Sequence, residues 1–162
     1  MPRRNGTYQK KKSPRPKHRL RMEFRNGHQF HIHSVSASSD GEHFISGDEV
    51  GINLWNINSN NVGYNLVNIA PPKMDDLLEV LTHCEFHPED PMVYLYSSSR
   101  GYFSVADLRS QNAHVKYDCT DEETHENTFS EIIQSVSHAS FSKDGCRIIS
   151  RDYLYIRLWD IR

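Results

Sequence analysis

An internal repeat of about 50 residues constrains the fold of this 162-residue chain more than any other feature. Three segments align: "SASSDGEHFISGDEVGINLWNI" (Ser36–Ile57), "CEFHPEDPMVYLYSSSRGYFSVADL" (Cys84–Leu108) and "ASFSKDGCRIISRDYLYIRLWDI" (Ala139–Ile161). The closing landmarks Trp55, Ala106 and Trp159 are 51 and 53 residues apart, and the turn landmarks Asp40, Asp90 and Asp144 are 50 and 54 apart. A fixed period of this length predicts supersecondary units that bury a core only by stacking on their neighbours.

Each repeat has the pattern of three antiparallel strands. Asp40-Gly41 and Asp144-Gly145 suit tight hairpin turns, because glycine reaches positive φ without a steric penalty. The runs "INLWNI" and "IRLWDI" alternate apolar and polar residues, which is the period of a strand. We expect Trp55 and Trp159 to fill the space between stacked sheets, and these residues, with Asp40 and Asp144, to be structural. Short strands with Trp-Asp at a fixed place are typical of a WD-type β-propeller.

The connection after the first repeat carries further signals. "YNLVNI" (Tyr64–Ile69) predicts an outer, fourth strand of the first unit. "KMDDLLEVL" follows two prolines and spaces its apolar residues Met74, Leu77, Leu78 and Leu81 at i, i+3, i+4 and i+7. This spacing predicts one or two helical turns.

The number of repeats limits the architecture. A closed propeller typically has four to eight blades, and the third repeat here reaches Arg162 directly after its third strand. We therefore predict an all-β fold: a partial WD40-type β-propeller of about three four-stranded antiparallel blades, the last one incomplete, with a short helical turn in one inter-blade connection. Such a chain is expected to be a fragment, a truncated paralogue or a chain completed by a partner.

The charge of the chain is unevenly distributed. Residues 1–25 carry ten Lys or Arg and one Glu, whereas residues 26–162 carry nine basic and twenty acidic residues. This division predicts a basic, disordered N-terminal arm over residues 1–25 and the partial propeller over residues 26–162. A basic arm of this kind binds nucleic acid, acidic lipid or an import receptor, or it only keeps the chain in solution.

Composition also bears on the location of the protein. No apolar run approaches the roughly 18 residues of a membrane span, and the N-terminus lacks the apolar core of a secretory signal. Cys84, Cys119 and Cys146 form no CxxC pair, which favours reduced thiols over disulfides or a zinc site. We expect a protein without a membrane partner, located in the cytoplasm and also in the nucleus.

The stretch "NGHQFHIHSVSASSD" (Asn26–Asp40) resembles a signature of the WD-repeat regulatory B subunits of protein phosphatase 2A. "SGDEVGINLWNI", "NLVNIAPPKMDDLLEVLTHCEFHP", "FSEIIQSVSHASFSKDG" and "SRDYLYIRLWDI" are similar to later motifs of that family, in the same order. The resemblance covers about residues 24–162 and leaves only the basic arm unmatched.

The resemblance implies a non-catalytic regulatory subunit that binds the scaffold and catalytic subunits of the phosphatase and presents phosphoprotein substrates. It also implies an acidic groove for basic or amphipathic helical segments. The positions matching the groove of the family are Phe30, His31, Asp48, Glu49, Leu77, Val80 and Phe129. We expect the carboxylates of Asp48 and Glu49 to face a Lys or Arg of a partner, where such pairs guide encounter and specificity. Leu77 and Val80 are expected to form an apolar ledge beside them.

Other functions are less well supported by the residues. His28, His31 and His33 suggest a metal site at first sight, but no carboxylate or thiol nearby has ligand spacing, and we expect neither metal nor cofactor. Serines near His31 and Asp40 lack a nucleophile elbow, so we expect no enzyme. The alternative function is a WD-repeat adaptor whose basic arm binds nucleic acid or chromatin.

Overall fold

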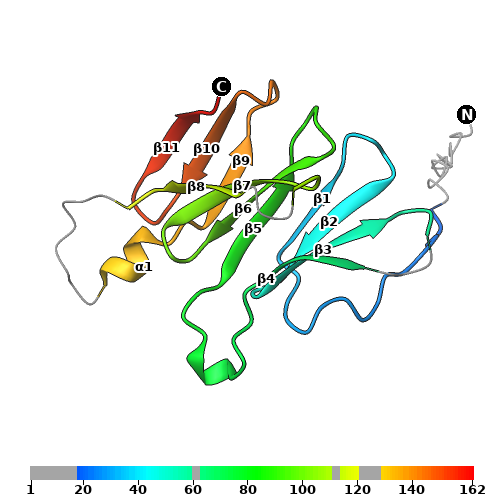
Figure 1. The fold of residues 1–162 in the computed structure, drawn as a ribbon, viewed down its shortest axis with the longest axis horizontal. Helices are drawn as coiled ribbons and strands as arrows, with labels where there is room; N and C mark the ends of the chain where they lie inside the picture. The colour runs from blue at the N-terminus through cyan, green and yellow to red at the C-terminus, as the bar shows by residue number, and fades with distance from the viewer. Residues whose placement is uncertain (1–17, 60–62, 111–113, 121–128) are drawn as a thin grey trace, which may run out of the picture.

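The computed structural model describes residues 18–59, 63–110, 114–120 and 129–162 of the chain. Within these ranges the chain forms three antiparallel sheets of four, four and three strands, placed side by side (Figure 1). Each sheet is made from consecutive strands, as expected when one repeat builds one unit. The all-β prediction, with three units and an incomplete last one, is confirmed.

The first sheet has the order β1-β2-β3-β4. Its strands are β1 (Ser34–Ala37), β2 (His43–Gly47), β3 (Gly51–Asn56) and β4 (Tyr64–Asn68). The turn between β1 and β2 contains Gly41 at φ 69°, which is the left-handed conformation predicted for an Asp-Gly turn. Phe44 of β2 pairs with Trp55 of β3, so these two residues lie on one face of the sheet, while Ile45 and its partner Leu54 lie on the other.

The second and third sheets repeat this arrangement. The second consists of β5 (Leu81–Phe86), β6 (Val93–Ser98), β7 (Tyr102–Asp107) and β8 (His114–Asp118). The third consists of β9 (His138–Phe141), β10 (Arg147–Arg151) and β11 (Ile156–Asp160), in the order β11-β10-β9. Gly145 has φ 66° in the turn between β9 and β10, equivalent to Gly41 in the first sheet.

Two helical turns lie in the connections between sheets, where the sequence predicted one. The predicted turn is the 3-10 helix η1 (Met74–Asp76), which ends because Leu77 adopts an extended conformation at φ −68°, ψ 109°. Leu81, expected on the same helical face, instead begins β5 and is buried in the core. Burial between two sheets therefore outweighs the helical spacing of the connection. The second turn, α1 (Ser130–Gln134), precedes β9.

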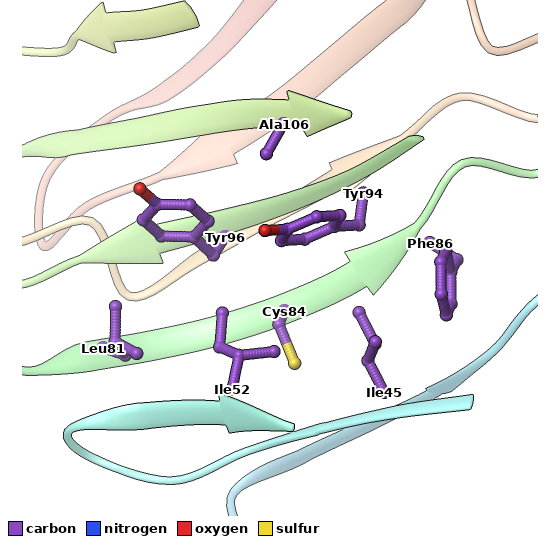
Figure 2. Packing of buried hydrophobic residues seen from close by; sticks show 8 residues of the cluster. All are labelled: Ile45, Ile52, Leu81, Cys84, Phe86, Tyr94, Tyr96 and Ala106. Carbon is purple, nitrogen blue, oxygen red and sulfur yellow. The ribbon is translucent and has the colours of Figure 1, made fainter. Parts of the chain in front are cut away.

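The core consists of two apolar layers, each between neighbouring sheets. Figure 2 shows the first, in which Ile45 and Ile52 of the first sheet point toward Cys84, Tyr94 and Tyr96 of the second. The second layer joins the other face of the middle sheet to the third; its buried members are Leu95, Phe103, Cys119, Val136, Ala139, Phe141 and Ile148. Fully burying such side chains stabilises the fold by about 1.5–3 kcal/mol each, so each sheet depends on its neighbour.

Among the described residues, no helix is long and apolar enough to cross a membrane.

Candidate functional site

One edge of the molecule gathers the turns between the second and third strands of every sheet. The connections that lead into β5 and β9 lie at the same edge, where η1 and α1 are also found (Figure 1). Main-chain hydrogen bonds join these segments: Leu81 N–H donates to Glu49 O at 2.8 Å, and Val136 N–H donates to Ser98 O at 3.2 Å. We call this edge the loop face. It is the region in which most of the predicted groove residues lie.

Asp48 lies at the start of the first of these turns and organises it. Its Oδ1 accepts hydrogen bonds from the N–H groups of Val50 (2.9 Å) and Gly51 (2.7 Å), and its Oδ2 lies 2.9 Å from Nδ1 of His28. His28 Nε2 in turn lies 2.6 Å from Ser46 Oγ, to which Trp55 Nε1 donates at 2.8 Å. A chain of polar contacts thus links the turn to the buried tryptophan of β3.

The structure corrects the expectation that Asp48 presents a free carboxylate to a partner. Only 3% of the residue is exposed, and both carboxylate oxygens already have partners within the fold. Burial opposes its ionisation, but the N–H donors of Val50 and Gly51 and the His28 imidazole outweigh that effect, so the pKa of Asp48 is lowered. Asp48 is therefore a tether for the turn, because a buried carboxylate is stable only when its oxygens are satisfied.

Glu49, the next residue, differs from Asp48 in its contacts. The side chain is half-buried, and its Oε2 is buried without a hydrogen-bond partner among the described residues. Its main-chain carbonyl accepts from Leu81 N–H, which places Glu49 beside the connection that contains Leu77 and Val80. An unsatisfied acceptor of this kind costs free energy until a donor reaches it. Glu49 is thus an acceptor without a partner among the described residues, and its side chain would have to rotate to meet a cation of another molecule.

A hollow of about 490 Å³ also lies on the loop face. It is lined by Leu78, Ser99, Arg100, Ile132, Gln134 and Ser135. Val80 N–H donates to Ser99 Oγ at 3.0 Å, and Arg100 Nε donates to Leu78 O at 3.1 Å, so the first connection forms one wall. Leu78 is 76% exposed and Ile132 is 63% exposed. The lining of the hollow therefore includes two apolar side chains that are largely uncovered.

The residues predicted from the sequence are neighbours of this hollow and do not line it. Leu77 and Val80 are half-buried beside it, and Phe129, 68% exposed, directly precedes α1. Arg100, Leu78 and Ile132 were not predicted. An i, i+3 pair such as Leu77 and Val80 shares a face only in a helix, whereas the chain is already extended at Leu77, and Leu78 is the residue whose side chain is exposed.

Phe30 and His31 were expected to line the groove. Both are exposed, and both lie before β1, which begins at Ser34. His33 N–H donates to Gly47 O at 3.0 Å, so the segment reaches the sheet only at that residue. Phe30 and His31 therefore remain candidate contact residues on a loop at the entrance to β1.

The histidines of the opening signature separate in the structure. His28 joins Asp48, whereas His33 electrostatically influences His83 of β5, whose ring stacks on that of His138 of β9 at 3.9 Å. Burial, together with His138 and His33, lowers the pKa of His83 to about 4. His83 and His138 occupy equivalent positions of their strands, and their 55-residue spacing is the sequence signal that would have revealed the pair. Within the described ranges, no three His, Cys, Asp or Glu residues are arranged to hold a metal ion.

The four predicted structural residues have the following surroundings. Trp55 is buried and stacks on Phe44 at 6.1 Å, and Trp159 is partly buried with its Nε1 donating to Ser150 Oγ at 2.8 Å. Asp40 accepts from the N–H of Glu42 and of His43 at 2.7 and 3.0 Å. Asp144 accepts from Cys146 N–H at 3.2 Å in the equivalent turn.

Comparison with known proteins gives a consistent set of relatives. The chain is 46% identical over 142 residues to a serine/threonine-protein phosphatase 2A regulatory subunit, phr2AB, of Dictyostelium discoideum, covering 85% of this chain and 29% of that protein. It is 43% identical over 145 residues to a protein phosphatase PP2A 55 kDa regulatory subunit of Drosophila melanogaster, covering 87% and 29%. The chain spans about a quarter to a third of the length of such relatives. No family model matches it.

A solved structure supports the fold. The β-propeller domain of Cps50 (Swd1) from Myceliophteria thermophila superposes with a TM-score of 0.62 at 16% identity, covering 85% of this chain and 41% of that chain. At this level of identity the similarity establishes a WD40-type propeller arrangement of the sheets.

Proposed function

We propose that the chain belongs to the family of 55 kDa regulatory B subunits of protein phosphatase 2A and acts as a non-catalytic, protein-binding subunit of this phosphatase. The proposal rests on 40–46% identity over most of the chain to proteins named as regulatory subunits. Since the chain spans only part of those proteins, the partners and substrates are proposals for this chain. The alternative adaptor function of the basic arm has no support from the comparisons.

We propose the loop face as the surface that contacts the partner. Its single most informative feature is the 490 Å³ hollow between the exposed side chains of Leu78 and Ile132, with the unpartnered oxygen of Glu49 beside the same connection. Apolar side chains in a hollow supply affinity when covered, while a few polar groups fix orientation. A basic, amphipathic helical segment of a phosphoprotein fits this combination, with its apolar face on the hollow and a Lys or Arg at Glu49.

Arg100 adds a second charge to the hollow. Its Nε is held by Leu78 O, so the guanidinium has a fixed position in the wall. The surface therefore presents an acceptor and a cation at separate points, which favours a partner with both basic and acidic residues over a purely basic one. Complementary charges of this kind select among partners more than they strengthen binding.

The test is binding of the purified chain to purified phosphatase scaffold and catalytic subunits by co-elution in size-exclusion chromatography. We expect a complex with the subunits, and we expect Leu78→Asp and Ile132→Asp to weaken binding of substrate peptides. Val115→Asp is a matched control, because Val115 is also exposed (56%) but lies in the outer strand β8. If the chain bound neither subunit, its similarity to the regulatory subunits would reflect common ancestry and not a shared function.

The cellular location is also a proposal. Membership of the regulatory-subunit family would place the chain in the cytoplasm, with a nuclear pool in addition. Fluorescence microscopy of the tagged chain tests this expectation.

A further inference from the structure

A threonine lies just beyond the end of β8, on the loop face. Thr120 is exposed and follows the last residue of that strand, Asp118, by two positions. The residue between them, Cys119, is buried and tied to the turn between β6 and β7, because its N–H donates to Gly101 O at 2.8 Å. Thr120 is therefore held where the second sheet meets the connection into β9.

The surroundings of Gly101 show how close this threonine lies to the hollow. A Cβ placed on Gly101 would lie 2.7 Å from Cγ2 of Thr120 and 3.2 Å from the main-chain oxygen of Gln134. Gln134 lines the hollow, and so does Arg100, the residue directly before Gly101. The side chain of Thr120 thus lies at the rim of the hollow, beside the backbone of Gln134 and the turn that carries Arg100.

The sequence that follows Thr120 is acidic. Residues 121–123 are Asp, Glu and Glu, so the stretch reads "TDEE"; these three acids lie outside the residues that the structure describes. Protein kinases whose substrate groove is basic select a serine or threonine that is followed by acidic residues, because the charges are complementary. Thr120 combines this sequence pattern with an exposed side chain, as a kinase substrate requires.

Two serines of the described residues are also followed by acids, but each lies in a tight hairpin turn. Ser39 Oγ donates to Glu89 O at 3.2 Å in the turn between β1 and β2. Ser142 Oγ donates to a carboxylate oxygen of Asp144 in the turn between β9 and β10. A kinase binds its substrate as an extended segment, so it would have to open these turns. Thr120 belongs to no hairpin turn and is the better candidate.

Arg100 is the cation that a phosphate group on Thr120 would meet. Its Nε donates to Leu78 O at 3.1 Å, and its guanidinium has no carboxylate partner among the described residues. The two Nη groups therefore keep donors for another acceptor, and a phosphate accepts from a guanidinium in a bidentate manner. The nearest cation of β8, Lys116, already has a partner, because its Nζ lies 3.3 Å from Oδ1 of Asp118.

We propose that Thr120 is a phosphorylation site for an acidic-directed protein kinase, and that its phosphate pairs with Arg100 at the rim of the hollow. In this step Oγ1 of Thr120 forms a bond to the γ-phosphorus of ATP, the bond from that phosphorus to the bridging oxygen breaks, and ADP leaves. The hydroxyl proton passes to the catalytic base of the kinase. The neutral hydroxyl is replaced by a group of about −1.5 to −2 charge at pH 7.

The modification changes the charge at one corner of the hollow. Without the phosphate, Arg100 presents a cation that repels basic residues of a partner. Pairing neutralises this cation and leaves the rim acidic, so the hollow then favours basic residues. This consequence for partner binding rests on the proposed function of the loop face, whereas the phosphorylation of Thr120 and its pairing with Arg100 do not.

The modification is tested on the purified 162-residue chain with ATP and casein kinase 2 as the acidic-directed kinase. We expect mass spectrometry of proteolytic peptides to locate a phosphate on Thr120. Thr120→Val is the control, because it keeps the shape of the side chain but lacks the hydroxyl, and it should lose most of the incorporation. Absence of phosphate from the native chain would overturn the proposal, and so would incorporation that is unchanged in Thr120→Val.

The pairing is measured by the ³¹P NMR signal of the phosphorylated chain as the pH is varied. A guanidinium close to the phosphate favours its dianion, so the signal of the native sequence should titrate at a lower pH than that of Arg100→Gln. Lys116→Gln is the matched control, because it removes a cation of equal charge from β8, and it should move the titration less. An equal titration in the native chain and Arg100→Gln would overturn the pairing, as would a larger effect of Lys116→Gln.

The effect on the hollow is measured with a synthetic amphipathic helical peptide of leucine and lysine. We expect the phosphorylated chain to bind this peptide about threefold more tightly than the unmodified chain, which is the size of effect of an exposed charge pair. Equal affinity of the two forms would overturn the change in charge preference. If neither form bound the peptide, the proposed function of the loop face would fail, while the kinase and NMR measurements would still decide the phosphorylation of Thr120.

Discussion

Asp48 Oδ2 lies 2.9 Å from His28 Nδ1, and the two side chains are 4% and 6% exposed. His28 belongs to the segment that precedes β1, so the pair joins this segment to the turn between β2 and β3. We expect Asp48→Asn to destabilise the fold by about 2–4 kcal/mol, because a buried pair that loses one partner leaves the other unsatisfied. Urea denaturation measures this difference. Asp75→Asn, at an exposed acid of η1, is the control and should have little effect.

Glu49 is expected to respond differently. Its buried Oε2 has no partner among the described residues, so Glu49→Gln breaks no hydrogen bond of that oxygen and should leave the free energy of unfolding nearly unchanged. Affinity for a basic substrate peptide should fall by about fivefold, as expected when a partly buried charge pair is lost. Calorimetric titration and urea denaturation of the same variant give the two values. Unchanged affinity would remove Glu49 from the proposed surface.

Gly145 and Gly41 offer a matched pair of substitutions. Both have a left-handed φ, at 66° and 69°, so Gly→Ala at either position costs about 1 kcal/mol of backbone strain. A Cβ at Gly145 would also overlap the ring of His87, whose Nε2 contacts Gly145 O at 3.2 Å between the second and third sheets. A Cβ at Gly41 meets no atom within 4 Å. Thermal denaturation should therefore show a larger drop in melting temperature for Gly145→Ala than for Gly41→Ala. Equal drops would mean that the turn at Gly145 does not pack against His87.

The stability of the fold should fall on mild acidification. Burial, His138 and His33 lower the pKa of His83 from its ordinary 6.5 to about 4, so between these values the unfolded chain binds a proton that the folded chain does not. Protons then favour unfolding, and the stabilising contribution present above pH 6.5 is lost as the pH falls toward 4. We expect a lower melting temperature at pH 5 than at pH 7. His83→Gln should reduce this drop, and His31→Gln, at an exposed histidine, should not.

Much of the fold was predictable from short-range sequence signals. Asp40-Gly41 and Asp144-Gly145 indicated hairpins because only particular residues adopt that backbone locally, and the period-2 runs around Trp55 and Trp159 indicated strands. The landmark spacing of about 50 residues then gave the number of sheets. The helical spacing from Met74 to Leu81 was misleading in part, because the apolar contact of Leu81 with the first sheet pulls that residue into β5.

The candidate site was predictable as a region but not as a set of contacts. Asp48 and Glu49 are adjacent acids in one turn and look interchangeable in the sequence. Only the folded chain brings His28 to Asp48 from 20 residues away and leaves Oε2 of Glu49 without a donor among the residues that the structure describes. Arg100 and Ile132 join Leu78 at one hollow because three separate connections meet at the loop face.

The sequence alone determined that this chain builds three stacked, antiparallel repeats of the propeller type, because turn residues, alternation and repeat spacing act locally or periodically. The tertiary structure decided which acid is buried and which keeps a free acceptor, and which apolar faces have a neighbour. These properties depend on groups that come into contact only when the sheets stack. Those contacts set the burial, the hydrogen-bond partners and the pKa of each side chain.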